Sequence, residues 1–318
     1  MGKVCFGVDV GGTTIKIGLF AEQGDLLDKW EIKTVPEVRE DTKSHQILID
    51  VAASVAEKCR ERDIATEDIL GIGVGIPGPI LADGTVIKTA NLGWGIFNIK
   101  DELRQLTGVD RIEVTNDANV AALGEMWKGG GKGYKNLILI TLGTGIGGGV
   151  VVDGKIVNGA TGAAGEIGHI KVKTDETVPC GCGRKGCLEQ YVAAAGIVRC
   201  ARRKLEESDE PSILRGVSPL TTREIFDGAK AGDAVSAAVT EEFGDIMGLA
   251  CAQMATILNP EVFVIGGGVS KAGPMIIDLI RKYFVPRVMA ALTDTKFVMA
   301  SLGNDAGIYG AAKMVIKE

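Results

Sequence analysis

A histidine and three cysteines stand close together in the chain, and their side chains are typical metal ligands: His169, Cys180, Cys182 and Cys187. This combination completes the Cys₃His set of tetrahedral structural zinc sites, and the intervening glycines allow tight turns between ligands. Four protein ligands leave no open coordination position, so we expect zinc to fix structure rather than to activate water. Glu166 and Glu189 flank the set and could accept hydrogen bonds from sugar hydroxyls.

Three glycine-rich turns, each after a predicted strand, form a second group of candidates. They occupy residues 9–16, 142–149 and 266–270. Glycines let backbone N–H groups approach phosphate oxygens, and threonine hydroxyls add donors. One glycine hairpin is usually only a hairpin, but three together favour phosphate binding. None has P-loop spacing, and the first does not open a helix as a dinucleotide-binding turn does. The candidate nucleotide-binding residues are Asp9, Gly11, Gly12, Thr13, Lys16, Thr144, Gly145, Gly267 and Gly268.

Two carboxylates stand at the ends of predicted strands, where α/β folds place their ligands. Asp9 ends the first strand and could hold Mg²⁺ through water, while Lys16 could neutralise phosphate charge. Asp117 follows a strand that ends at Asn116, and a carboxylate beside an amide suits a general base with its substrate anchor. The alternative, that Asp117 only caps the following helix, stays open.

The elements that must position these residues alternate between strands and helices. We predict strands at residues 3–10, 14–20, 69–76, 111–116, 137–142, 146–152, 262–265 and 297–301, with a further strand ending near residue 35. We predict helices at residues 43–62, 117–127, 190–207, 222–231, 233–258, 274–289 and 305–316. The first strand–turn–strand unit recurs about 130 residues later, with Asp9 aligned to Thr141, which predicts a duplicated α/β fold.

Composition narrows the class of protein. The chain has 318 residues, which suggests two domains, and a formal net charge of −6. An acidic chain without a basic tail is a poor candidate for binding nucleic acid or a membrane. The sequence has no room for a signal peptide before Asp9, and no apolar run reaches the ~18 residues of a membrane span. We therefore expect a soluble, cytoplasmic protein.

The remaining cysteines, histidine and basic residues have simpler interpretations. Seven cysteines do not make a disulfide scaffold, and a close cluster of three indicates metal before disulfide. The four single cysteines are interpreted as buried thiols: Cys5, Cys59, Cys200 and Cys251. We expect His45, at a polar helix start, to be exposed. The basic residues within 199–204 precede Glu206 and Glu207, which favours a solvated helix face over a nucleic-acid patch.

These motifs resemble those of the ROK family (repressors, open reading frames and sugar kinases) of the actin-like ATPase superfamily. Residues 9–16 and 142–149 are similar to its two phosphate motifs, and residues 73–79 are similar to a further signature. The segment 166–169 and the cysteine-rich stretch that ends at Glu189 are specific to the family. The resemblance covers essentially the whole chain. Asn91-Leu92-Gly93-Trp94 and the length are similar to bacterial members that phosphorylate glucose.

The resemblance implies an α/β, actin-like ATPase (ribonuclease H-like) fold with two duplicated lobes around a central cleft, sugar deep inside and ATP above it. The expected smaller lobe comprises residues 1–117 plus 303–318, and the larger lobe, with the zinc site, residues 118–302. Asp117 would be the catalytic base. Sugar contacts would come from Asn91, Asn116, Asp117, Glu166, His169 and Glu189, and zinc would be held by His169, Cys180, Cys182 and Cys187.

The activity implied is ATP-dependent phosphorylation of glucose at its 6-hydroxyl, with Mg²⁺, by a homo-oligomer (dimer or tetramer). The nearest alternative is a kinase for mannose, fructose or an N-acetylhexosamine. A sugar-responsive regulator would need a helix-turn-helix before the first phosphate motif, where eight residues precede Asp9. A silent sugar-binding module would be expected to lack Asp117. Because the phosphate turns lie elsewhere in the chain, we expect zinc loss to disturb sugar binding more than ATP binding.

Overall fold

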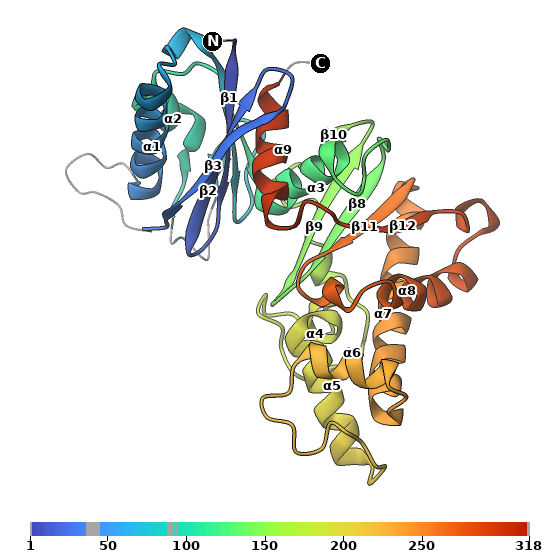
Figure 1. The fold of residues 1–318 in the computed structure, drawn as a ribbon. Coiled ribbons are helices and arrows are strands. Elements are labelled where there is room, and N and C mark those ends of the chain that lie inside the picture. Colours follow the sequence, from blue (N-terminus) through green and yellow to red (C-terminus); the bar gives the residue numbers. More distant parts are fainter. Residues whose placement is uncertain (1, 36–44, 88–91, 93, 317–318) are drawn as a thin grey trace. The chain divides into compact units, whose positions relative to one another are not determined.

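The computed structural model describes residues 2–35, 45–87, 92 and 94–316 (Figure 1). Contacts divide the chain into two compact units. The first comprises Met1–Lys135, Gly149–Gly165 and Leu302–Glu318, and the second comprises Asn136–Gly148 and Glu166–Ser301.

Five strands form the sheet of the first unit, in the order β3-β2-β1-β4-β7. Their bounds are β1 Val4–Val10, β2 Thr14–Ala21, β3 Leu26–Lys33, β4 Ile69–Ile76 and β7 Ile112–Asn116. Strand β2 pairs antiparallel with β1 and β3, whereas β4 pairs parallel with β1 and β7. The carboxyl ends of β1, β4 and β7 therefore meet at one edge of the sheet, where Asp9 and Asn116 lie.

Helices cover both faces of this sheet (Figure 1). Helices α1 (Gln46–Arg62) and α2 (Ile99–Thr107) lie on one face, and α9 (Ala306–Val315) lies on the other beside α3 (Asp117–Lys128). Because successive strand residues point to opposite faces, the core is divided accordingly. Phe6 belongs to the cluster that includes α1 and α2 side chains, whereas Cys5 packs in a separate cluster with Ile308 of α9.

Glycines bring α9 into direct contact with its neighbours in the first unit. A Cβ at Gly73 of β4 would lie 1.8 Å from the carbonyl oxygen of Ala311, and one at Gly124 of α3 would lie 2.1 Å from that of Ala306. A Cβ at Gly149 would likewise lie 2.5 Å from the carbonyl oxygen of Ala118. This packing places α3 and Gly149–Gly165 in the first unit, whereas the predicted lobes assigned residues 118–302 to the other unit.

The second sheet repeats the order of the first, as β10-β9-β8-β11-β12. Its strands are β8 Leu137–Leu142, β9 Ile146–Val152, β10 Lys155–Ile156, β11 Val262–Gly266 and β12 Lys296–Met299. Strand β11 pairs parallel with β8 and β12, as β4 does with β1 and β7. The predicted duplication of an α/β unit is therefore confirmed.

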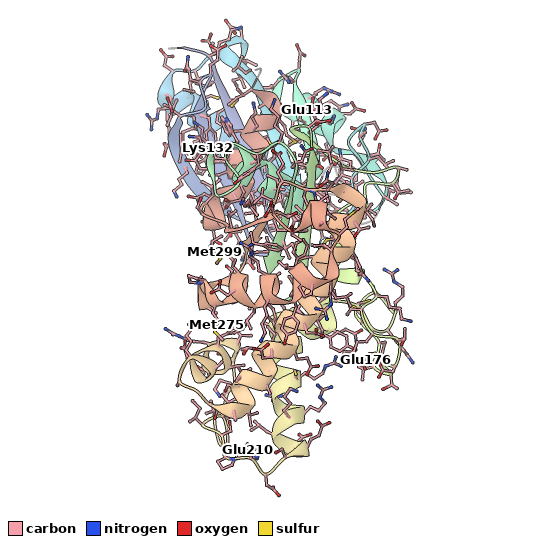
Figure 2. All side chains as sticks on the ribbon, turned by 90° about the vertical axis from the view of Figure 1, so that its right-hand side faces the viewer. Glu113, Lys132, Glu176, Glu210, Met275 and Met299 are labelled. Atoms are coloured by element: carbon pink, nitrogen blue, oxygen red, sulfur yellow. The ribbon has the colours of Figure 1, made fainter. Side chains whose placement is uncertain are left out.

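Helices make up most of the rest of the second unit. They are α4 Glu189–Val192, α5 Ala194–Glu207, α6 Thr222–Lys230, α7 Ala234–Leu258 and α8 Met275–Phe284. Figure 2 shows Glu210, in the segment after α5, at the end of this unit farthest from Met299 of β12. Phe263, Phe284 and Phe297 pack together between β11, α8 and β12. Among the described residues, no helix combines the length and the apolar character that crossing a membrane requires.

Most predicted elements are present, and two of the predicted helices differ. Helix α2, the strand β10 and the short pair β5 (Thr85–Val86) and β6 (Phe97–Asn98) were not predicted. The predicted helix 190–207 is broken at Ala193, whose backbone is extended. The predicted helix 274–289 ends at Phe284, because Pro286 two residues later cannot continue an α-helix.

The prediction of an exposed His45 is wrong. The residue is only 8% exposed, its ring stacks on Phe97 with centroids 3.6 Å apart, and its Nδ1 lies 3.1 Å from Oε2 of Glu102. Glu102 comes from the unpredicted α2, so no signal local to His45 indicated this burial. Cys5 and Cys251 are buried as predicted, whereas Cys59 and Cys200 are partly exposed.

Candidate active site

Asp9 and Asp117 form a pair of partly buried carboxylates in the first unit. Asp9 stands near the end of β1, opposite Lys16 on β2, and Asp117 is the first residue of α3. The pKa of Asp9 is raised to about 6, because burial and the nearby charge of Asp117 raise it by more than Lys16 lowers it. Burial also raises the pKa of Asp117, while a hydrogen bond from the Ala118 N–H at 2.8 Å lowers it. A buried carboxylate with a raised pKa is a stronger base than one in water.

The helix cap beside Asp117 is Asn116. Its Oδ1 accepts a hydrogen bond from the Ala118 N–H at 2.9 Å, as an N-cap side chain does. Its Nδ2 donates to the carbonyl oxygen of Gly78 at 3.2 Å, inside the signature segment 73–79. The alternative interpretation of Asp117 as a plain cap is therefore not supported, because the preceding residue holds that position.

The N-terminus of α9 closes the other side of Asp9. A Cβ at Gly307 would lie 2.3 Å from Oδ2 of Asp9, so only glycine leaves room for this carboxylate. The Nζ of Lys16 donates to the carbonyl oxygen of Asn304 at 2.9 Å. An anionic side chain at the start of a helix is also favoured by the helix dipole. Asp9 and Lys16 are thus both fixed by the segment that leads into α9.

The first and third glycine turns contain glycines that protein packing does not require. No atom of the described residues lies within 4 Å of a Cβ built on Gly12 or on Gly268. Gly268 also has an ordinary φ of −63°. By contrast, Gly267 has a φ of +85°, and its Cβ would lie 2.4 Å from the carbonyl oxygen of Leu142. Gly267 is therefore needed by the fold, whereas Gly12 and Gly268 leave open space for a ligand to approach the backbone.

A polar pocket lies beside Gly268 in the second unit. Its volume is about 460 Å³, and α6 and the turn after β11 line it with Thr222, Arg223, Phe226, Asp227, Gly268, Val269, Lys271 and Ala272. Sequence reasoning missed the α6 residues, because α6 is distant in the chain from the glycine turn that it faces. The charged and hydroxyl groups of the lining suit the polar groups of a nucleotide.

The four predicted zinc ligands come together in the second unit. Their ligand atoms all lie within 4.8 Å of one another. The Sγ atoms of Cys182 and Cys187 are 3.7 Å apart, and Sγ of Cys180 is 3.8 Å from Nδ1 of His169. Zn–S bonds of ~2.3 Å in a tetrahedron put sulfur atoms about 3.8 Å apart, so donor set and spacing both fit zinc. Hydrogen bonds with Arg184 lower the pKa of Cys182 to about 6, which favours the thiolate that zinc requires.

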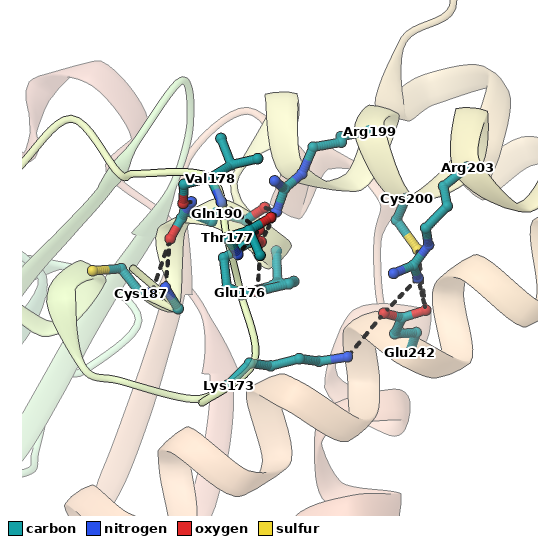
Figure 3. A network of polar contacts seen from close by, with 12 residues as sticks. Lys173, Glu176, Thr177, Val178, Cys187, Gln190, Arg199, Cys200, Arg203 and Glu242 are labelled. Carbon is teal, nitrogen blue, oxygen red and sulfur yellow. Dashed lines mark hydrogen bonds and ion pairs between the residues drawn. The ribbon is translucent and has the colours of Figure 1, made fainter. Parts of the chain in front are cut away.

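A network of polar contacts supports the loop that carries these cysteines (Figure 3). Oε1 of Gln190 accepts hydrogen bonds from the Gly186 and Cys187 N–H groups, and its Nε2 donates to the carbonyl oxygen of Val178 at 2.9 Å. The Glu176 carboxylate accepts from the Tyr191 hydroxyl at 2.7 Å and from Arg199 at 2.8 Å, and its pKa is lowered to about 2. These supporting residues gave no sequence signal.

The basic residues of α5 take part in the same network. Arg203 and Lys173 both pair with Glu242, while Arg199 pairs with Glu176 (Figure 3). The side chains of Arg199 and Arg203 are 41% and 45% exposed. They lie on a solvated helix face as predicted, but each is paired with a carboxylate rather than free.

The predicted site residues fall into two groups, one in each unit. Asp9, Lys16, Asn116 and Asp117 lie at one sheet edge of the first unit with the first glycine turn. The second unit holds the four predicted zinc ligands and the residues Thr144, Gly145, Glu166, Glu189, Gly267 and Gly268. Asn91 lies outside the described residues.

Duplicated α/β units, each with a glycine hairpin between its first two strands, define the fold of the actin-like ATPases. The comparisons with known proteins agree. The chain is 43% identical over 316 residues to a glucokinase of Halalkalibacterium halodurans (97% of this chain, 94% of the relative). It is 36% identical over 318 residues to a glucokinase of Thermotoga maritima (98% and 96%).

A solved structure gives the same result. The crystal structure of a ROK family glucokinase from Streptomyces griseus, in complex with glucose and AMPPNP, matches with a TM-score of 0.72 and 33% identity, over 98% of each chain. A family model described as the ROK family matches residues 5–318. The chain belongs to the ROK family.

Proposed function

We propose that this protein is a sugar kinase that transfers the γ-phosphoryl group of ATP to the 6-hydroxyl of glucose, giving glucose 6-phosphate and ADP. The observation that carries the proposal is the pair of carboxylates Asp9 and Asp117, with Lys16 beside Asp9 and a glycine hairpin directly after it. The glucokinases among its relatives support glucose as the substrate.

The residues of the first unit suit the proton transfer of this reaction. Asp117 would accept the proton of the sugar 6-hydroxyl as that oxygen attacks the γ-phosphorus in line. The raised pKa of Asp117 matches this role, and its place at the start of α3 holds it still. Lys16 and the N–H groups of the glycine turns would stabilise the charge on the phosphoryl oxygens. Mg²⁺, when bound, neutralises phosphate charge, and Asp9 would hold it.

We place the sugar contacts on Asn91, Asn116, Asp117, Glu166, His169 and Glu189, with Asn91 resting on sequence alone. Zinc would be held by the Cys₃His set and would fix the loop from Glu166 to Glu189. Because Nδ1 of His169 faces Cys180, its Nε2 stays available to a sugar hydroxyl. The nucleoside end of ATP would occupy the pocket between α6 and Gly268.

A panel of hexoses tests the substrate. ADP release would be measured with glucose, mannose, fructose, N-acetylglucosamine and N-acetylmannosamine at saturating Mg²⁺-ATP. We expect glucose to have the highest kcat/KM, because a site built to bond particular hydroxyls can reject an analogue by ~10⁴-fold. If an N-acetylhexosamine or fructose has the highest kcat/KM, glucose is overturned as the substrate, but the assignment to the sugar kinases stands. ADP release with none of them would overturn both.

The proposal extends to assembly and location. We propose a cytoplasmic homo-oligomer, a dimer or tetramer, that binds neither nucleic acid nor membranes. Light scattering after size exclusion would give a multiple of the 33.3 kDa chain mass. A mass equal to one chain at working concentrations would contradict this part of the proposal.

A further inference from the structure

The second phosphate hairpin is held by the loop that carries the zinc ligands. This hairpin joins β8 to β9 and includes Thr144 and Gly145. The Ile146 N–H donates a hydrogen bond of 2.9 Å to Oε2 of Glu189. A Cβ at Gly145 would lie 2.5 Å from the same oxygen, so the carboxylate lies directly against the hairpin. The other carboxylate oxygen, Oε1, lies 3.8 Å from Sγ of the zinc ligand Cys180.

Two further contacts hold the same hairpin from the same stretch of chain. A Cβ at Gly168, next to the zinc ligand His169, would lie 3.0 Å from the carbonyl oxygen of Ile146. The Ala194 N–H donates to the carbonyl oxygen of Gly143 at 2.9 Å. This last bond explains the break between α4 and α5, because the extended backbone at Ala193 turns the next N–H out of the helix.

We infer that Glu189 is a positioning residue for nucleotide phosphate, in addition to its proposed contact with sugar. Glycine hairpins bind phosphate through backbone N–H groups, and they do so tightly only when those groups are already in place. A hairpin of glycine and threonine has little stiffness of its own, since glycine loses the most conformational freedom on ordering. The hydrogen bond from Ile146 to a carboxylate supplies that stiffness from outside the hairpin.

This inference bears on the expectation that zinc loss would disturb ATP binding less than sugar binding. That expectation placed the phosphate turns away from the zinc loop, whereas Gly168, Glu189 and Ala194 all touch the hairpin. The inference deepens the proposed function and rests on its assignment of the hairpin to phosphate. It predicts a coupling between zinc site and nucleotide that a purely sugar-binding Glu189 would not produce.

The test measures nucleotide binding without sugar, where a contact between Glu189 and sugar cannot contribute. Titration calorimetry would follow Mg²⁺-AMPPNP binding to the zinc-loaded wild type and to E189Q and E189A. Gln keeps an acceptor for the Ile146 N–H but loses the charge, and Ala removes the acceptor. Hydrogen bonds to charged groups are among the stronger ones, so we expect about tenfold weaker binding in E189A and an intermediate loss in E189Q.

The matched control is E166Q, which changes the other flanking glutamate of the zinc loop. The carbonyl oxygen of Glu166 accepts a hydrogen bond from the His169 N–H at 3.1 Å, and among the described residues its side chain makes no hydrogen bond to the hairpin. E166Q should raise the KM for sugar while binding AMPPNP as the wild type does. Equal AMPPNP affinity in wild type and E189A would overturn the inference. Tighter binding in E189A would also overturn it, since the carboxylate would then repel phosphate rather than hold the hairpin.

A second variant covers the case in which E189A loses zinc or folds poorly. G168A adds a Cβ 3.0 Å from the carbonyl oxygen of Ile146 and keeps the carboxylate. It should weaken AMPPNP binding at full zinc content, and unchanged binding would count against the hairpin's support by this loop. The two proposals fail separately. If AMPPNP affinity falls from wild type through E189Q to E189A but no hexose is phosphorylated, only the kinase proposal is rejected. If the three proteins bind AMPPNP equally and glucose turnover is normal, only the positioning role is rejected.

Discussion

Replacing Asp9 by asparagine should stabilise the first unit at neutral pH and abolish the proposed phosphoryl transfer. The reason is the cost of keeping this carboxylate ionised. Its pKa is raised from 3.8 to about 6, first by burial and then by the charge of Asp117. A carboxyl whose pKa is higher in the folded state gives stability that is complete below the unfolded pKa and is lost as the pH rises through the folded pKa.

The folded and unfolded pKa values of Asp9 determine how much its ionisation destabilises the folded protein. Ionising Asp9 costs the folded protein about 2 kcal/mol at about pH 5 and about 3 kcal/mol at about pH 7.5. Asparagine does not titrate and has nearly the same shape. The free energy of unfolding of D9N, relative to wild type, should therefore rise by about 1 kcal/mol between these two pH values.

The three tryptophans provide a selective assay. Trp30, Trp94 and Trp127 all lie in the first unit, so their fluorescence during urea unfolding reports on the unit that contains Asp9. The buffer must lack Mg²⁺, because a bound cation would favour the ionised carboxylate. The control is Asp110→Asn, which changes an exposed carboxyl of the same unit. Its free energy of unfolding relative to wild type should change little between the two pH values.

This reasoning would be refuted if the free energy of unfolding of D9N, relative to wild type, stays constant or decreases from about pH 5 to about pH 7.5. It would mean that Asp9 ionises in the folded protein as easily as in water. The expected result, a more stable and inactive variant, would show that the first unit gives up stability in order to present a charged group to its ligand.

Three other substitutions test the site. Asp117→Asn should lower kcat by ~10²–10⁴-fold while calorimetry still detects glucose binding, and near-normal turnover would assign the base to another residue. Cys182→Ser should lower zinc content, thermal stability and the affinity for both glucose and AMPPNP; elemental analysis with titrations checks this, and an unchanged glucose KM would contradict it. Gly307→Ala would place a Cβ 2.3 Å from Oδ2 of Asp9, so kcat should fall by ~10²-fold with little change in far-UV circular dichroism, and full activity would show that the position of Asp9 is not critical.

Local patterns in the sequence predicted the elements of the fold because those patterns arise within each element. Short apolar runs bounded by turns predicted the strands, and the repeated glycine turn predicted the second sheet. The clustering of four potential metal ligands was also predictable, since four donors with the right chemistry occur within one short stretch. The choice of Asn116 over Asp117 as the helix cap was not predictable, because both residue types are good caps and only the backbone decides.

The features that sequence reasoning missed all depend on contacts between distant segments. His45 is buried because α2 brings Glu102 to it, and the break at Ala193 exists because Gly143 accepts a hydrogen bond from the next residue. A glycine-rich turn looks the same whether its glycines serve the fold or a ligand. Only the surroundings separate Gly267, which Leu142 crowds, from Gly268, which faces open space.

The two hairpins of the duplicated fold differ in how each is equipped to bind phosphate. In the first, Asp9 and Lys16 face each other across β1 and β2 and supply charge directly. The aligned position in the second is Thr141, whose hydroxyl donates to the carbonyl oxygen of Gly147 within its own unit. A second carboxylate in the hairpin itself would add repulsion against phosphate without a lysine to offset it. The second hairpin instead has a carboxylate at its side, from Glu189, which holds the Ile146 N–H and leaves the glycine backbone available. In the proposed mechanism one hairpin would therefore act by charge and the other by backbone geometry, which the loop of the predicted zinc ligands would keep fixed.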